Sequence, residues 1–243
     1  MNRVSLITAI KDRAESLEVA FATWINIRGV SQIIIVDWSS KDTSAIEKVA
    51  RQDSRVLVAR VENEIYFNHT RTKNLGINLS DGDVIVVTDA DIMIHPRLRH
   101  LFSVPRLRRL FSASNANDKL FYRGWIPGGY GTIVARRHML DAVGGYDERM
   151  EGWGGSDDDL YLRLTLHGFQ FAYIPQRLLT HIDHSEEARH LNMMIRGRKE
   201  SQLINAGIVR QHGLWSKDLY ASTHKPITAT LWSSYGYLET RIV

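Results

Sequence analysis

DVIVVTDAD, residues 83–91, is a short apolar run of Val and Ile that ends in two aspartates. Short β-branched runs bounded by turn residues favour buried strands over helices. Similar runs precede it at residues 4–10, 32–38 and 55–61, and helical patterns separate them, the clearest at 14–27 and 68–79. Strands that alternate with helices and are apolar nearly throughout predict an α/β domain whose parallel sheet is buried on both faces.

The second half of the chain has more Gly and Trp than the first. Glycine-rich corners lie at 127–129, 144–145 and 152–155, a short strand at 177–180, and helical patterns at 156–167 and 186–204. No internal repeat or low-complexity linker divides the chain. We therefore expect the second half to build onto the first sheet within one domain.

Composition excludes several classes of protein. Of the 243 residues, 44% are hydrophobic and 24% charged, as in globular domains, so a disordered or fibrous chain is excluded. The absence of cysteine excludes disulfides, thiolate metal sites and a cysteine nucleophile. No run of roughly 18 apolar residues and no signal-peptide pattern occurs, so we expect a cytoplasmic protein without a membrane span.

The net charge of +4 comes from 31 basic and 27 acidic residues, and much of the excess lies in the arginine-rich stretch 97–109. In some proteins such a stretch contacts an anionic membrane surface or a nucleic acid. In others it is a solvated helix face. The sequence leaves both interpretations open.

Aspartates stand where predicted strands end. In open α/β sheets, ligands bind beyond the carboxyl ends of the parallel strands, where Asp37, Asp89 and Asp91 fall. Because residues two apart in extended backbone point to the same side, Asp89 and Asp91 present two carboxylates suited to a hard divalent cation that bridges phosphates. Asp-x-Asp also occurs at 81–83 and 157–159, so it is the preceding strand that singles out this pair.

The stretch GWGGSDDDL at 152–160 predicts the start of a helix. Ser156 and Asp159 fit a capping box, with Ser at the N-cap and an acid three residues later. Arg163 lies one turn further on, where it can pair with Asp159. These roles leave the neighbouring acids, Asp157 and Asp158, unexplained.

Clustered acids beside a flexible aromatic side chain predict a general base near a sugar, with Trp153 lying between glycines. His181 and His184 follow a predicted strand, and imidazoles at a strand end are candidate metal ligands. Their spacing matches no zinc-protease pattern.

At these residues the chain resembles glycosyltransferases of the GT-A fold, most specifically the β-1,4-galactosyltransferase type and bacterial chondroitin-polymerase-like family 2 enzymes. The matching segments are, in order, TAIKDR at 8–13, FNHTRTKNLG at 67–76, DAD at 89–91, and the glycine-rich signature at 128–129, 145–146 and 152–159. The resemblance covers roughly residues 3–190. It implies a Rossmann-like, mostly parallel sheet flanked by helices, in a single domain with a nucleotide-binding half at 1–95 and an acceptor-binding half at 96–190. We expect residues 191–243 to be a helical extension packed on this domain.

The resemblance also implies roles for individual residues. Donor binding is expected at Thr8, Lys11, Arg13, Asp37, Phe67, Arg71, Asp89 and Trp153; acceptor binding at Trp153, Gly155, Asp157 and Asp158; and metal binding at Asp91, His184 and His181. Asp157 matches the catalytic base. The chain departs from the family pattern at four of the named positions: His69 replaces an arginine, Arg71 a lysine, Ser156 a glutamate and His181 a methionine.

The implied activity is inverting, Mn²⁺- or Mg²⁺-dependent transfer of a hexose or N-acetylhexosamine from a UDP-sugar to a glycan or lipid-linked glycan, in bacterial or viral polysaccharide or glycolipid synthesis. We expect a cytoplasmic enzyme, in peripheral contact with the inner face of an anionic membrane through 97–109, and no nucleic acid partner. The alternatives are a GDP-sugar donor and a non-catalytic basic module that binds anionic membrane or nucleic acid. A sugar nucleotidyltransferase is disfavoured, because no glycine-rich loop follows the first strand.

Overall fold

The computed structural model describes residues 3–95, 119–125, 129–183, 192–195, 197–214, 226–234 and 236–243. The predicted metal ligand His184 and the arginine-rich stretch 97–109 lie outside these ranges.

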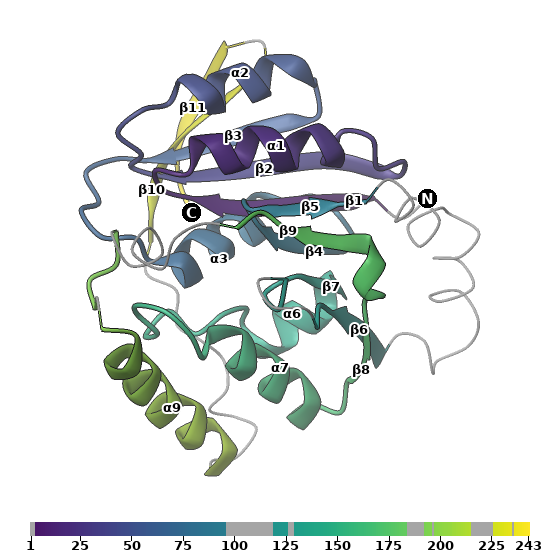
Figure 1. Cartoon of the computed structure of the whole chain (residues 1–243), viewed down its shortest axis with the longest axis vertical. Helices are drawn as coiled ribbons and strands as arrows, with labels where there is room; N and C mark the ends of the chain where they lie inside the picture. The colour runs from purple at the N-terminus through teal and green to yellow at the C-terminus, as the bar shows by residue number, and fades with distance from the viewer. Residues whose placement is uncertain are drawn as a thin grey trace.

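A mixed β-sheet forms the centre of the molecule (Figure 1). Within the described ranges its strand order is β11-β10-β3-β2-β1-β4-β7-β6-β8. The strands are β1 (Val4–Ile10), β2 (Val30–Trp38), β3 (Val56–Val61), β4 (Val84–Asp89), β6 (Leu120–Arg123), β7 (Ile133–Arg136), β8 (Gln170–Tyr173), β10 (Thr228–Ser233) and β11 (Gly236–Ile242). A second, two-stranded sheet pairs β5 (Ile92–Ile94) with β9 (Leu179–His181), which follows the 3-10 turn η3 (Gln176–Leu178).

Helices cover both faces of the central strands. Helices α1 (Ala14–Trp24) and α2 (Ser44–Gln52) lie on one face, whereas α3 (His69–Leu79), α6 (Arg137–Val143) and α7 (Ser156–Leu166) lie on the other (Figure 1). Helix α9 (Arg198–Leu214) packs against α7. The mostly parallel, doubly covered sheet confirms the predicted fold class.

Two hydrophobic cores explain why the strands are apolar nearly throughout. In β1, Leu6 faces the core under α1 and α2, while Ile7 faces the core under α3 and α7. Successive residues of a strand point to opposite faces, so a strand covered on both sides must be apolar at every position.

The strand directions bring several strand ends to one edge. Strands β3, β2, β1 and β4 are parallel, β7 runs antiparallel to β4, and β6 and β8 run antiparallel to β7. Strands β6 and β8 therefore point the same way as β4, and their carboxyl ends share the edge at which Asp89 ends β4.

Two predictions for the C-terminal part are wrong. The helix predicted at 186–204 is not continuous, because residues 192–195 are not helical and α9 runs from Arg198 to Leu214; residues 186–191 lie outside the described ranges. The extension after residue 190 is not wholly helical, because β10 and β11 form a hairpin that joins the sheet at β3. Ala229 and Leu231 alternate along β10 and are buried against the sheet, a period of two that favours a strand.

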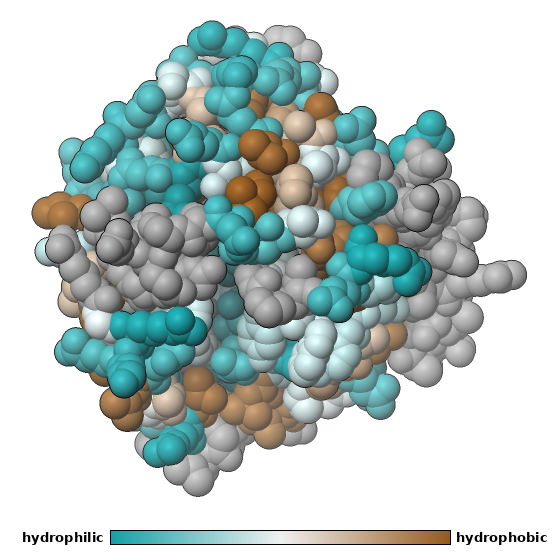
Figure 2. Space-filling view, viewed as in Figure 1, coloured by the Kyte–Doolittle hydropathy of each residue, from teal (hydrophilic) through white to brown (hydrophobic). Residues whose placement is uncertain are grey.

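The surface of the described part follows the amphipathic pattern of its helices. Helix α2 buries Ala45, Ile46, Val49 and Ala50 and turns polar side chains outward, and hydrophilic residues cover that region in Figure 2. No helix in the described ranges is both long enough and apolar enough to cross a membrane.

Candidate active site

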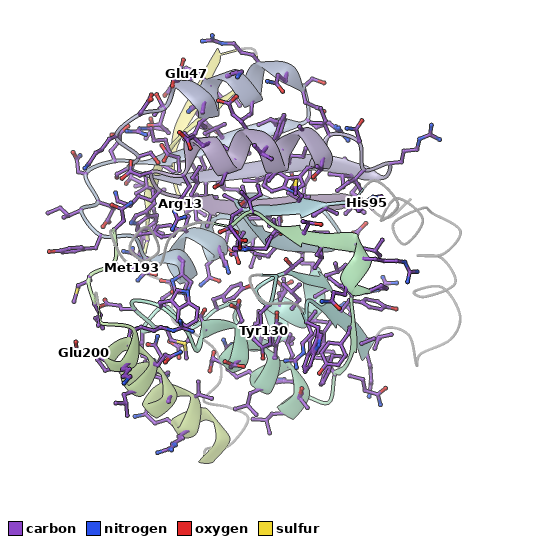
Figure 3. All side chains as sticks on the ribbon, in the orientation of Figure 1. Arg13, Glu47, His95, Tyr130, Met193 and Glu200 are labelled. Atoms are coloured by element: carbon purple, nitrogen blue, oxygen red, sulfur yellow. The ribbon has the colours of Figure 1, made fainter. Side chains whose placement is uncertain are left out.

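A cavity of about 470 Å³ opens at the carboxyl edge of the sheet. Its lining includes Lys11, Arg13, Phe67, His69, Lys73, Asp89, Asp91, Tyr130, the segment 152–158, His181, Asn192, Met193, Arg198 and Gln202. Arg13, Tyr130 and Met193 are far apart in the sequence, but Figure 3 shows them around the same central region. Ligands bind at this edge in open α/β folds, which makes the cavity the candidate active site.

A buried lysine lies between two of the predicted site carboxylates. Lys73 Nζ is 3.2 Å from Asp89 Oδ1 and 3.5 Å from Asp157 Oδ1. Gly131 allows the two acids to approach, because a Cβ there would lie 2.8 Å from Asp89 Oδ2 and 3.1 Å from Asp157 Oδ2. The three side chains form one compact charged cluster on the cavity wall.

Helix α3 places Lys73 in this cluster. Asn68 caps the helix by accepting a hydrogen bond from the backbone N–H of Arg71 at 3.0 Å. The buried face of α3 then carries Thr70, Lys73, Asn74 and Ile77 at helical spacing. Sequence reasoning missed Lys73, and the available signal was a lysine at a helix position that otherwise faces the core.

The charges in the cluster are mutually dependent. Burial alone would lower the pKa of Lys73, but the carboxylates of Asp157 and Asp89 outweigh it and raise that pKa well above its usual value. Burial raises the pKa of Asp157, and Lys73 opposes this rise. Lys73 therefore favours the ionised form of Asp157, against the effect of burial.

His69 and Ser156, two residues that differ from the family pattern, contact each other in the cavity wall. His69 Nε2 lies 2.8 Å from Ser156 Oγ. Burial, followed by the charge of Lys73, lowers the pKa of His69 to about 3. The imidazole is therefore neutral at physiological pH, and the pair is an uncharged hydrogen bond in a wall that already holds three charges.

Asp91 pairs with a different side chain from Asp89. Strand β4 ends at Asp89, and Asp91 follows in a turn. The alternation of side chains along a strand, which predicted that both carboxylates point to the same side, therefore does not extend to Asp91. Pairing of β5 with β9 instead brings His181 Nε2 to 3.6 Å from Asp91 Oδ2. His181 Nδ1 is 3.2 Å from Asp183 Oδ1, a second contact that orients the ring.

Asp91 and His181 suit a divalent cation. A carboxylate oxygen and an imidazole nitrogen are common ligands at about 2.0–2.2 Å, which a 3.6 Å separation accommodates. No cluster of three or more His, Cys, Asp or Glu side chains that could hold a metal occurs among the described residues. These two residues would therefore need further ligands, and His184 lies outside the described ranges.

Helix α9 holds the glycine-rich loop that carries Trp153. Ser201 Oγ donates to the Trp153 carbonyl at 2.8 Å and accepts from the Trp153 backbone N–H at 3.2 Å. Asn205 Nδ2 donates to the Glu151 carbonyl at 2.9 Å. The Arg198 guanidinium lies over the Trp153 ring, 4.2 Å from its centroid. The C-terminal extension, for which the sequence predicted no site residue, thus forms part of the cavity wall.

The start of α7 differs from the predicted capping box. Gly155, at φ +90°, is the N-cap and no side chain caps the helix, so the predicted cap at Ser156 is wrong. The left-handed backbone of Gly155 leads the chain into the helix. The Ser156 hydroxyl is hydrogen-bonded to His69 rather than to the helix N-terminus. The predicted Asp159–Arg163 pair is confirmed: Arg163 Nε donates to Asp159 Oδ2 at 2.7 Å with both side chains fully buried.

Asp158 faces the cavity beside an aromatic side chain. Tyr130 Oη donates to Asp158 Oδ1 at 2.7 Å, and burial together with this hydrogen bond raises the pKa of Tyr130 to about 12. Asp157 and Asp158, adjacent in the first turn of α7, thus have different partners, Lys73 and Tyr130.

Not all predicted donor residues reach the cavity. Lys11 lines it, but its ammonium donates to the carbonyls of Trp38, Ser39 and Glu64 at 2.9–3.0 Å and ties three loops together. Thr8, Asp37 and Arg71 are absent from the cavity lining. Thr8 is fully buried in β1, Asp37 is buried against Arg60 and the backbone N–H of Ser40, and Arg71 lies over the Trp38 ring near Glu64 and Glu148.

Comparison with known proteins relates the chain to glycosyltransferases. A family model described as the N-terminal domain of galactosyltransferase matches residues 110–190. The undecaprenyl-phosphate 4-deoxy-4-formamido-L-arabinose transferase of Proteus mirabilis is 28% identical over 174 residues, which are 59% of this chain and 52% of that protein. This chain therefore spans about half the length of that relative.

Solved structures share the fold at low sequence identity. The mannosyltransferase PcManGT from Pyrobaculum calidifontis, in complex with GDP-Man and Mn²⁺, has a TM-score of 0.59 at 16% identity. The alignment covers 78% of this chain and 59% of the mannosyltransferase chain. The catalytic domain of Drosophila β1,4-galactosyltransferase 7, in complex with xylobiose, has a TM-score of 0.59 at 15% identity over 95% and 86% of the two chains. The chain therefore has the GT-A fold and resembles glycosyltransferases of the galactosyltransferase type.

Proposed function

We propose that this chain is a metal-dependent, inverting glycosyltransferase that moves a hexose or N-acetylhexosamine from a UDP-sugar to a glycan or lipid-linked glycan. The observation that carries the proposal is one cavity in which a carboxylate–imidazole pair, Asp91 and His181, shares the wall with a lysine-held carboxylate, Asp157. The transferase activity named for the bacterial relative and the nucleotide-sugar and Mn²⁺ complex of the mannosyltransferase support it.

The metal side of the cavity would receive the donor diphosphate. Asp91 and His181 would hold the cation, with Mn²⁺ or Mg²⁺ as candidates. A cation bound there supplies positive charge that stabilises the leaving diphosphate. Arg13 and Phe67 line the cavity from other elements and would contact the nucleotide.

Asp157 is positioned to act as the general base. Burial raises its pKa and so strengthens the carboxylate as a proton acceptor, while the charge of Lys73 favours its ionised form. Asp157 would take the proton of the acceptor hydroxyl while the oxygen bonds to the anomeric carbon and the bond from that carbon to the diphosphate breaks. A single displacement of this kind inverts the anomeric configuration. Asp158 and Trp153 would bind the acceptor sugar.

A GDP-sugar donor is the second candidate. The mannosyltransferase whose fold this chain shares was solved with GDP-Man and Mn²⁺. The donor would bind in the same cavity, with the same metal ligands and the same general base. Only the wall that contacts the nucleobase would differ.

Thermal stability with UDP, GDP and CMP, each with Mn²⁺ and again with EDTA, tests the proposal. A nucleotide at about 100 times its Kd adds about 2.7 kcal/mol to the free energy of unfolding, a rise in Tm of about 5–10 °C. We expect this rise with UDP and Mn²⁺ and its loss in EDTA. A rise with GDP alone supports the second candidate, and no rise with any nucleotide contradicts both.

Variants separate the roles. Asp91→Asn and His181→Ala should abolish the Mn²⁺-dependent rise, whereas Asp157→Asn should keep it and abolish sugar transfer. His138→Ala is the matched control, since His138 is exposed on α6 and does not line the cavity. An Asp157→Asn protein with unchanged turnover contradicts the role of this residue as the base.

A further inference from the structure

We propose that aromatic side chains at the ends of β6 and β8 form a second sugar-binding site, which holds units of a glycan acceptor beyond the one that reacts. The inference rests on the proposed function and extends it from the cavity to the neighbouring surface. Its residues, named here the aromatic platform, are Arg123, Trp125, Tyr130, Phe171 and Tyr173.

Three rings of the aromatic platform are exposed. Trp125 is 60% exposed, Tyr173 45% and Phe171 41%. Large rings on a surface contribute little to folding, and a cluster of them marks a binding surface more often than chance exposure does. In Figure 2 the surface around the ends of β6 and β8 is pale, the colour of residues of intermediate hydropathy.

One arginine contacts three of the rings. The Arg123 guanidinium carbon lies 4.5 Å from the Phe171 ring centroid, 5.2 Å from Tyr173 and 5.3 Å from Tyr130. The guanidinium also donates to the Tyr173 hydroxyl at 3.2 Å, and Trp125 packs edge-on against Tyr173 at 4.9 Å. Cation–π contacts of this kind fix the rings, so little side-chain entropy is left to lose on binding.

The sheet topology joins the aromatic platform to the cavity. Tyr173 ends β8 and Trp125 follows β6, so both lie at the sheet edge where Asp89 ends β4. Tyr130 belongs to both sites, because it lines the cavity and donates to Asp158. Three strand spacings separate β4 from β8, about 14 Å, farther than a single sugar bound at Asp157 extends.

The chemistry favours a glycan. A pyranose ring presents a face of C–H groups with hydroxyls around its rim, which suits aromatic rings bordered by tyrosine hydroxyls and an arginine. Nucleic acid bases also stack on aromatic rings, but their phosphates require a positive groove, whereas the side chain bound to Tyr130, where the aromatic platform meets the cavity, is the acid Asp158. A glycan whose last sugar reacts at Asp157 would extend across Tyr130 onto Trp125 and Tyr173.

Calorimetric titration with xylo-, cello-, chito- and malto-oligosaccharides of two to six units, in the presence of UDP and Mn²⁺, tests the proposal. We expect affinity for at least one series to rise about tenfold or more from two to six units. The double variant Trp125→Ala/Tyr173→Ala should lose this gain. Tyr237→Ala is the matched control, since Tyr237 is 66% exposed on the opposite edge strand, β11.

The outcomes separate this proposal from the proposed function. The double variant should keep the UDP–Mn²⁺ rise in Tm, because neither residue lines the cavity. Wild-type protein without that rise contradicts the proposed function, whatever the oligosaccharides do. If the Tm rises normally with UDP and Mn²⁺ but affinity does not depend on oligosaccharide length, the aromatic platform is not a glycan site. The same conclusion follows if the double variant shows the same gain in affinity with length. Tight binding of single-stranded RNA that the double variant loses, without any oligosaccharide gain, overturns the proposal as well.

Discussion

Replacing Lys73 by methionine leaves Asp89 and Asp157 facing each other without their counter-ion. Lys73 is 2% exposed, but Asp89 and Asp157 keep 38% and 24% of their side-chain surface in water. Removing one partner of a fully buried ion pair costs roughly 3–5 kcal/mol. Because water screens the two acids in part, we expect a loss of about 2–3 kcal/mol from the free energy of unfolding at pH 8. The matching fall in Tm is about 4–12 °C.

The loss should depend on pH in a defined direction. Burial raises the pKa of Asp157 above its unfolded value, so the protonated form favours the folded state at low pH, and this contribution disappears as pH rises. Lys73 opposes the rise in pKa, so its removal enlarges the effect. We therefore expect Lys73→Met to lose less stability at pH 5 than at pH 8.

Urea and thermal unfolding at both pH values, without added metal, measure these effects. Lys48→Met is the matched control, because Lys48 is exposed and pairs only with Glu18 among the ion pairs described; its effect should stay within about 0.5 kcal/mol. The double variant Lys73→Met/Asp89→Asn should recover part of the loss. Equal stability of Lys73→Met and Lys48→Met at pH 8, or a loss of the same size at pH 5, refutes the counter-ion role.

Two further predictions concern buried polar groups. Arg163→Met should lower the free energy of unfolding by roughly 3–5 kcal/mol in urea, because Asp159 and two backbone carbonyls lose their donor; a loss below about 1 kcal/mol contradicts this. Since burial and then Lys73 lower the pKa of His69 to about 3, its ring should show no NMR titration between pH 8 and 5. Stability should fall as pH drops from about 6.5 toward 3, because the unfolded state then binds the extra proton, and His69→Gln should flatten that fall.

The strands and most helices were predictable because their patterns are local. The run at 4–10 became β1 with the same bounds, and the predicted helix at 156–167 became α7. The hairpin β10–β11 was missed, since β11 is exposed along its whole length and shows no apolar alternation. The helix start at 156 was predicted correctly, but its cap was not, because Ser156 has a partner 87 positions away in the sequence.

For the candidate site, the sequence by itself determined the kinds of groups and their strand and helix ends: acids at 89–91, acids at 157–158 and a histidine at 181. Tertiary structure decided which of them meet. Pairing of β5 with β9 joins His181 to Asp91, and the packing of α3 places Lys73 between Asp89 and Asp157. The physical reason is that periodicity encodes which side chains face inward, whereas the partners they find there depend on elements packed together from distant parts of the chain.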